Sequence, residues 1–134
     1  MAQHLGTHSW GVQLSQGNQT ITREPSGSTI LRPSNASDLN AILIFTIPTP
    51  TTGNLAEAHV HFTTQNAFVN KVVVYYGHEM AWQSAENLGN TGTFSIDAHT
   101  GVARGNRGIG MAVYVQFEDP SSRFRLRSVG LSYT

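Results

Sequence analysis

The sequence contains no cysteine, which excludes disulfides, thiol nucleophiles and thiolate metal sites. Charge is also scarce, because only 12% of the 134 residues are Asp, Glu, Lys or Arg, about half the usual share. No run approaches the roughly 20 apolar residues of a membrane span, and the first residues lack the basic and apolar regions of a secretory leader. We therefore expect a protein without membrane contact that folds by packing alone, either cytoplasmic or a mature form whose leader was removed.

Net charge is absent as well. Eight basic residues balance eight acidic ones, so the whole molecule has no field to attract a polyanion, and we do not expect nucleic acid as the main partner. The basic residues are nevertheless unevenly distributed, and five arginines in the last third leave room for a local anion site. These are Arg104, Arg107, Arg123, Arg125 and Arg127.

Short segments rich in β-branched and aromatic residues recur about every dozen positions, separated by Gly, Pro, Asn and Ser, and no window keeps a helical period. The pattern predicts one all-β domain over residues 1–134, an antiparallel, jelly-roll-like sandwich of two sheets with nine or ten strands. The predicted strands cover residues 8–14, 20–24, 28–32, 41–47, 55–64, 68–77, 79–85, 93–98 and 109–117, followed by a final pair after residue 121.

Two of these segments predict how the core is built. Ala41–Ile47 is apolar nearly throughout, as a central strand covered on both faces would be. Leu55–Thr64 alternates, which places its apolar side chains on one face and brings His59 and His61 together on the other.

The histidine pair is the sharpest local motif, because histidines two apart on a strand point the same way and can share a metal ion. Gly53-x5-His59-Val-His61 also resembles the opening of the cupin motif G-x5-H-x-H-x3-E. Gln65 holds the glutamate position, however, and the second half of the motif is absent. Since a neutral amide replaces an anionic ligand, a polar, solvent-facing pair is our first interpretation and a metal site our second. We expect no other cofactor.

A second cluster, in residues 75–82, brings aromatic, imidazole and carboxylate groups together around a turn. Such a mixture suits sugar binding, because a ring face stacks on the C–H side of a pyranose while polar groups take its hydroxyls. The alternative is that strand alternation buries Trp82 and one of the two tyrosines as ordinary core. The candidate ligand-binding residues here are Tyr76, His78, Glu79 and Trp82.

Arginines supply two further candidate regions. Arg104 and Arg107 lie on a Gly-rich loop, where guanidinium and backbone N–H groups could bind a carboxylate or phosphate, so both join the candidate ligand residues. The loop lacks the Lys-Ser/Thr pair of a P-loop, and a solvated loop is the alternative. Arg123, Arg125 and Arg127 alternate with apolar residues, which indicates an outer sheet face or a guarded edge strand.

Three segments, Ile47–Pro50, Val72–Gly77 and Gly108–Val115, resemble a family of small, mostly bacterial, uncharacterised proteins with an I-P-T-P segment and a G-I-G-I-S-like strand. The likeness spans nearly the whole chain. It implies a β-sandwich, whose prolines end a strand and whose glycines admit close packing, and it implies no particular activity.

Three classes of function fit these observations. The leading one is a non-catalytic, lectin-like module that holds a carbohydrate or similar polar ligand at loops on one end of the sandwich, because the chain is neutral and rich in polar and aromatic residues. The second is a small cyclase or isomerase with His59, His61 or Glu79 as acid or base in an apolar cavity. The third is a structural or self-assembling protein. We assign no catalytic residue, since no paired carboxylates or nucleophile context is visible, and an exposed edge strand makes a homodimer plausible.

Overall fold

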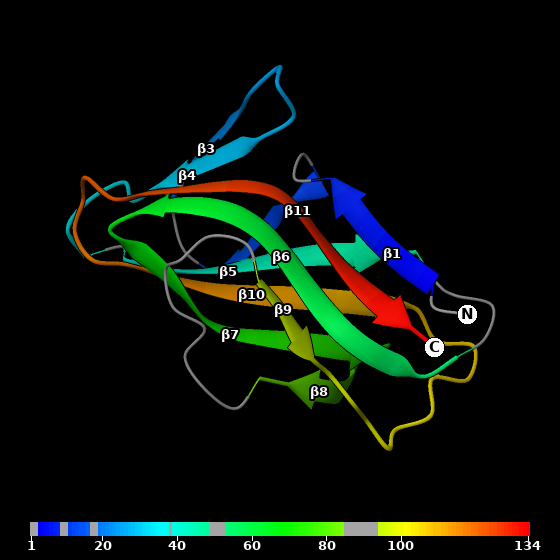
Figure 1. Cartoon of the computed structure of the whole chain (residues 1–134). Coiled ribbons are helices and arrows are strands. Elements are labelled where there is room, and N and C mark those ends of the chain that lie inside the picture. The colour runs from blue at the N-terminus through cyan, green and yellow to red at the C-terminus, as the bar shows by residue number, and fades with distance from the viewer. Residues whose placement is uncertain (1–2, 9–10, 17–18, 38, 49–52, 85–93) are drawn as a thin grey trace.

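Figure 1 shows the computed structural model of the chain, which describes residues 3–8, 11–16, 19–37, 39–48, 53–84 and 94–134. Within these ranges the chain forms eleven strands and no α-helix, and it therefore has no helix that could span a membrane. The strands are β1 (Gln3–His8), β2 (Gln13–Gln16), β3 (Thr20–Arg23), β4 (Thr29–Arg32), β5 (Asn40–Ile47), β6 (Leu55–Gln65), β7 (Ala67–Tyr76), β8 (Glu79–Gln83), β9 (Phe94–Asp97), β10 (Ile109–Phe117) and β11 (Arg123–Tyr133).

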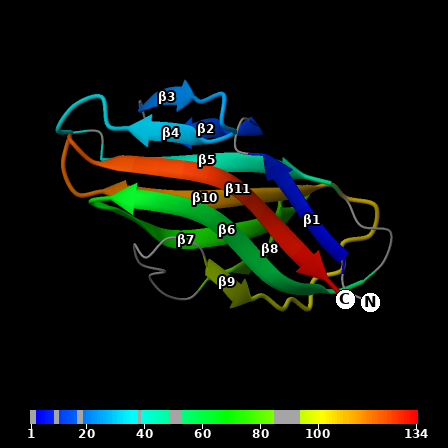
Figure 2. The ribbon, with the colours of Figure 1, turned by 45° about the horizontal axis from the view of Figure 1, so that its top comes forward.

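The strands form two stacked antiparallel sheets (Figure 2). Sheet A has the order β3-β4-β11-β6-β9, and β1 pairs with the second half of β11 on the edge whose first half pairs with β4. Sheet B has the order β2-β5-β10-β7-β8. The chain passes repeatedly from one sheet to the other, as jelly-roll connections do. The predicted two-sheet, antiparallel sandwich is thereby confirmed.

The core lies between the sheets and takes the inward residue of each alternating pair. Met111 and Val113 of β10 are 1% and 0% exposed, as the sequence pattern predicts. Val60 and Phe62 of β6 face them from sheet A and are equally buried. Phe62 stacks on Phe124 of β11 with ring centroids 5.0 Å apart. Because each such side chain contributes about 1.5–3 kcal/mol when fully buried, this shared core holds the two sheets together.

The first predicted strand, 8–14, is wrong as a single element. In the structure β1 ends at His8 in sheet A, and β2 begins at Gln13 in sheet B. Val12 lies between them and is 1% exposed, so the chain crosses the core here. Trp10, also assigned to that strand, lies outside the described residues. An alternating pattern does not distinguish one strand from two short strands in different sheets, which explains the error.

The segment 41–47 is the central strand that its sequence predicts, but it is covered on one face only. β5 lies between β2 and β10, and its residues Leu43 and Phe45 face the core. Ile44 points the other way and is 36% exposed. The prediction of burial on both faces is therefore wrong, because an apolar side chain on the outer face does not disturb the pairing of the strand.

The predicted final pair of strands is one continuous strand, β11. Its pairing with β6 shifts register between Leu126 and Ser128, so a bulge interrupts the alternation. Before the bulge Phe124 and Leu126 face the core, and after it Val129 and Leu131 do. Because the core-facing residues change from even to odd positions at the bulge, the sequence pattern looks like two separate strands. β11 is central in its sheet, so the guarded-edge interpretation is wrong and the outer-face interpretation is right for Arg123, Arg125 and Arg127.

Candidate functional site

A groove of about 500 Å³ lies on the outer face of sheet A, where β1, β11 and β6 run side by side (Figure 1). Val60 and Phe62 of β6 are buried in the core, so the alternating His59 and His61 face outward into the groove. The prediction that the two histidines share a face is confirmed. The groove is lined by Leu5, Gly6, Thr7, His59, His61, Ser128, Val129, Gly130 and Leu131.

Glycines at matching positions of neighbouring strands make this face hollow. Gly6 of β1 pairs with Gly130 of β11, and Gly130 also pairs with His59 of β6. A Cβ atom at Gly130 would lie 2.7 Å from the carbonyl oxygen of Leu5, closer than real Cβ contacts come. Glycine is therefore required for β1 to approach β11 this closely, and the floor of the groove at this point is bare backbone.

The two imidazoles differ in their surroundings. His59 is half-buried, and its Nε2 is hydrogen-bonded to Oγ of Ser132 at 2.6 Å. Ser132 is 1% exposed, so this contact fixes the ring against the sheet. His61 is exposed and pairs across the strands with Ser128. Within the described ranges no hydrogen bond engages the His61 ring, which leaves both of its nitrogens to a ligand.

A metal site at the histidine pair would need a third protein ligand, and none of the described residues supplies one. Among the described residues, no group of three or more His, Asp or Glu side chains could hold a metal ion. Gln65, at the glutamate position of the cupin-like motif, lies six residues from His59 on the same strand, roughly 20 Å away. His59 and His61 both face outward, so neither lies in a cavity between the sheets, where the enzyme alternative places its acid or base.

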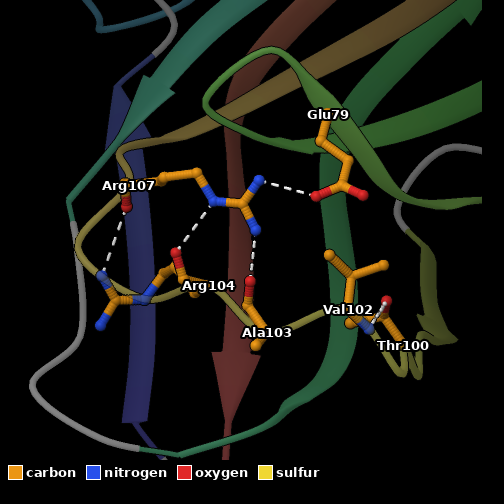
Figure 3. Close-up of polar contacts among 6 residues, drawn as sticks. All are labelled: Glu79, Thr100, Val102, Ala103, Arg104 and Arg107. Atoms are coloured by element: carbon orange, nitrogen blue, oxygen red, sulfur yellow. Dashed lines mark hydrogen bonds and ion pairs between the residues drawn. The ribbon is translucent and has the colours of Figure 1, made fainter.

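A second cluster forms at one end of the sandwich, where the β7–β8 turn meets the loop that precedes β10 (Figure 3). Arg107 Nη1 contacts Glu79 Oε1 at 2.7 Å, Arg107 Nε donates to the carbonyl oxygen of Arg104 at 3.1 Å, and Arg107 Nη2 donates to that of Ala103. Arg104 Nη1 donates to the carbonyl oxygen of Arg107 at 3.3 Å. The predicted residues Glu79, Arg104 and Arg107 are thus brought together, but their polar groups largely bind one another.

The remaining predicted ligand residues are divided between core and surface. Tyr76 is 2% exposed, and its hydroxyl is hydrogen-bonded to that of Tyr133 at 2.9 Å inside the core. Tyr76 therefore cannot meet a surface ligand, and the alternative of a core tyrosine is correct. Burial, reinforced by this hydrogen bond, raises the pKa of Tyr133. Trp82 is half-buried against the core, and His78 is exposed in the turn.

No family model and no curated protein sequence matches the chain. Solved structures do match it. A low-affinity xylan-binding module, CBM86, from Roseburia intestinalis has a TM-score of 0.62 at 13% identity and covers 100% of this chain and 96% of that one. A family 29 carbohydrate-binding module has a TM-score of 0.57 at 9% identity, with 98% and 89% covered. A CBM61 module solved with β-1,4-galactotriose has a TM-score of 0.56 at 10% identity, with 91% and 86% covered. At these identities the likeness shows a shared β-sandwich fold.

The groove itself is not predicted from the sequence, although its two histidines are. Its floor depends on Gly6 and Gly130, which are 124 positions apart in the sequence and become neighbours only through the β1–β11 register. Gly130 carried a usable signal, because a glycine inside a strand pattern often marks a place where another backbone comes close. That signal identifies the position but not the strand that approaches it.

Proposed function

We propose that the chain is a non-catalytic carbohydrate-binding module whose glycan lies in the groove on the outer face of sheet A. The observation that carries the proposal is the hollow of about 500 Å³, which is open to solvent, floored by glycine backbone and bordered by imidazole and hydroxyl groups. The likeness in fold to modules described as binding xylan, or solved with a galactotriose, supports the same class of ligand.

The chemistry of the groove suits a sugar chain. A pyranose presents a C–H face and a rim of hydroxyls, so its site needs a flat floor and polar groups at the sides. The Gly6–Gly130 pair lets a ring approach the sheet without meeting side chains. His61 and Ser128, opposite one another on β6 and β11, offer ring nitrogens and a hydroxyl to the sugar hydroxyls.

Binding is best tested by calorimetry of the full chain with soluble xylan, cello-oligosaccharides and β-1,4-galactan. We expect at least one of these to bind, and His61→Ala to weaken it about fivefold to tenfold, because one polar contact and one ring face are lost. His61 is exposed, so its replacement leaves the fold intact.

His78→Ala is the matched control, because it removes an exposed imidazole from the β7–β8 turn, which belongs to the other sheet. It should leave affinity unchanged. If His78→Ala weakens binding and His61→Ala does not, the ligand lies at the β7–β8 turn and the groove is the wrong site. If none of the glycans binds at millimolar concentration, the proposed function itself is wrong.

A further inference from the structure

Four of the seven arginines gather on the outer face of sheet A, beyond the groove. Arg125 of β11 pairs with Ile30 of β4 and with Thr63 of β6. Arg32 and Arg123 lie next to the inward Leu31–Phe124 pair on these strands, so both face outward. The cluster, here called the arginine patch, consists of Arg32, Arg123, Arg125 and Arg127, all exposed.

Among the described residues, the arginine patch is only partly neutralised. Like charges on adjacent strands repel one another, so a face built only for folding would carry counter-ions. Within the ranges that the structure describes, the single ion pair of the patch joins Arg125 Nε to Glu24 Oε1 at 3.3 Å, and both Nη groups of Arg125 remain open. Glu118 and Asp119 lie in the turn before β11 and form no ion pair with any residue of the described segments, and Asp119 Oδ1 accepts from the amide of Ser121.

The patch is also hollowed. A depression of about 210 Å³ is bordered by Arg123 and Arg125 together with polar residues of β6, including Thr63. A second depression, of about 470 Å³, lies between Arg125, Arg127 and the β3–β4 turn. Arg125 borders both. Guanidinium groups at the rim of a depression can present their paired N–H donors to a carboxylate.

The patch continues the groove along the same two strands. Ser128 lines the groove, and Arg123 lies five residues away on β11, about 16 Å along the strand. A sugar chain that follows β6 and β11 out of the groove therefore reaches the guanidinium groups. We infer that the ligand is an acidic glycan, a polysaccharide bearing uronic-acid carboxylates that the arginine patch binds. This inference rests on the proposed function, since it places one ligand across both regions.

The test uses two polysaccharides, glucuronoxylan and polygalacturonate, each before and after reduction of its carboxyl groups to alcohols. Reduction removes the charge and keeps the sugar backbone, so affinity electrophoresis of the full chain in low salt isolates the contribution of the carboxylates. We expect the acidic form of at least one polysaccharide to bind about fivefold or more tightly than its reduced form, with the difference shrinking in high salt.

The preference for the acidic form should disappear in the double variant Arg123→Gln, Arg125→Gln. Lys71→Gln is the control, because it removes one positive charge from the outer face of sheet B, where Lys71 Nζ lies 4.2 Å from the centre of the Tyr114 ring. The control should keep the preference. Thermal unfolding of the double variant should occur close to that of the parent, because relief of repulsion between exposed charges offsets the loss of the exposed Arg125–Glu24 ion pair. Arg127→Gln, which leaves that pair in place, provides a second variant if the double variant unfolds at a lower temperature.

The two proposals fail differently. Equal binding of acidic and reduced polysaccharide, or a preference that survives in the double variant, overturns the acidic ligand and leaves the module a binder of neutral glycans. Absence of binding to both forms here and to every neutral glycan tested above overturns the proposed function and the inference together.

Discussion

The outer faces of the two sheets are built from the same alternation but end up with opposite shapes. On sheet A the outward positions around the β1–β11 pairing carry Gly6 and Gly130, and a groove results. On sheet B the corresponding outward row carries Ile44, Ala112 and Val73. Ala112 and Val73 are 3% and 1% exposed although they point away from the core, and the depression on this face, of about 220 Å³, lies beside Ile44 at the β2–β5 edge. The small outward residues of sheet A therefore leave room for the larger hollow, of about 500 Å³.

The glycines of the two sheets differ in the same way. Each sheet has one glycine on an outward position of a central strand, Gly130 in β11 and Gly110 in β10. A Cβ at Gly130 would meet the Leu5 carbonyl oxygen at 2.7 Å, whereas a Cβ at Gly110 would find its nearest atoms at 3.9 Å, an ordinary contact. Glycine is therefore required at position 130 of sheet A, whereas position 110 of sheet B has room for a side chain.

The strongest test of this comparison replaces each of the two glycines by alanine in a separate variant. Gly130→Ala forces β1 away from β11, and overpacking of this kind costs about 1–3 kcal/mol of unfolding free energy, a fall of about 4–10 °C in Tm. Gly110→Ala should leave stability unchanged or raise it by up to about 0.5 kcal/mol, because alanine restricts the unfolded chain. Thermal denaturation of both variants measures the difference.

The same pair reports on the groove. Gly130→Ala should also reduce glycan affinity, since the displaced β1 forms one side of the site, whereas Gly110→Ala should bind as the parent does. Equal stability of the two variants would mean that β1 does not pack against β11 as described.

A polar contact between Tyr76 and Tyr133 joins the inner faces of the sheets and gives a second and smaller effect. Tyr133→Phe leaves the buried hydroxyl of Tyr76 without its partner, at a cost of about 1–2 kcal/mol. The double variant with Tyr76→Phe should recover most of this loss, because it removes both hydroxyls. Denaturant unfolding of the two single variants and the double variant measures the coupling, and additive losses would contradict a shared hydrogen bond.

The pH dependence follows from the same contact. Burial raises the pKa of Tyr133 above its ordinary value of 10.0. The stability that comes from keeping this tyrosine neutral is therefore complete below about pH 10 and is lost as the pH rises above it, because the unfolded chain ionises first. Tyr133→Phe should flatten this decline in unfolding experiments between pH 9 and pH 11.

The sequence predicts features that depend on a single strand well, and features that depend on the pairing of two strands poorly. Alternation along β6 and β10 predicts which side chains face the core, because the period of two is a local property. It predicts neither the bulge near Ser128, which imitates a strand break, nor the β1–β11 register that puts Gly6 opposite Gly130. The clustering of Glu79 with Arg107 joins segments that are 28 residues apart, and only their chemistry was visible in advance.

The smallest expected effect comes from the Glu79–Arg107 ion pair. It tests whether the ligand binds in the groove or beside the β7–β8 turn. Glu79→Gln removes the ion pair with Arg107, whose side chain is 36% exposed while that of Glu79 is 51% exposed. Since solvent screens such pairs, we expect a loss below about 0.5 kcal/mol that vanishes in high salt. Arg107 keeps its bonds to the carbonyl oxygens of Ala103 and Arg104, so the loop retains its shape. Glycan affinity should be unchanged, and a large loss of either stability or binding would move the functional site from the groove to this end of the molecule.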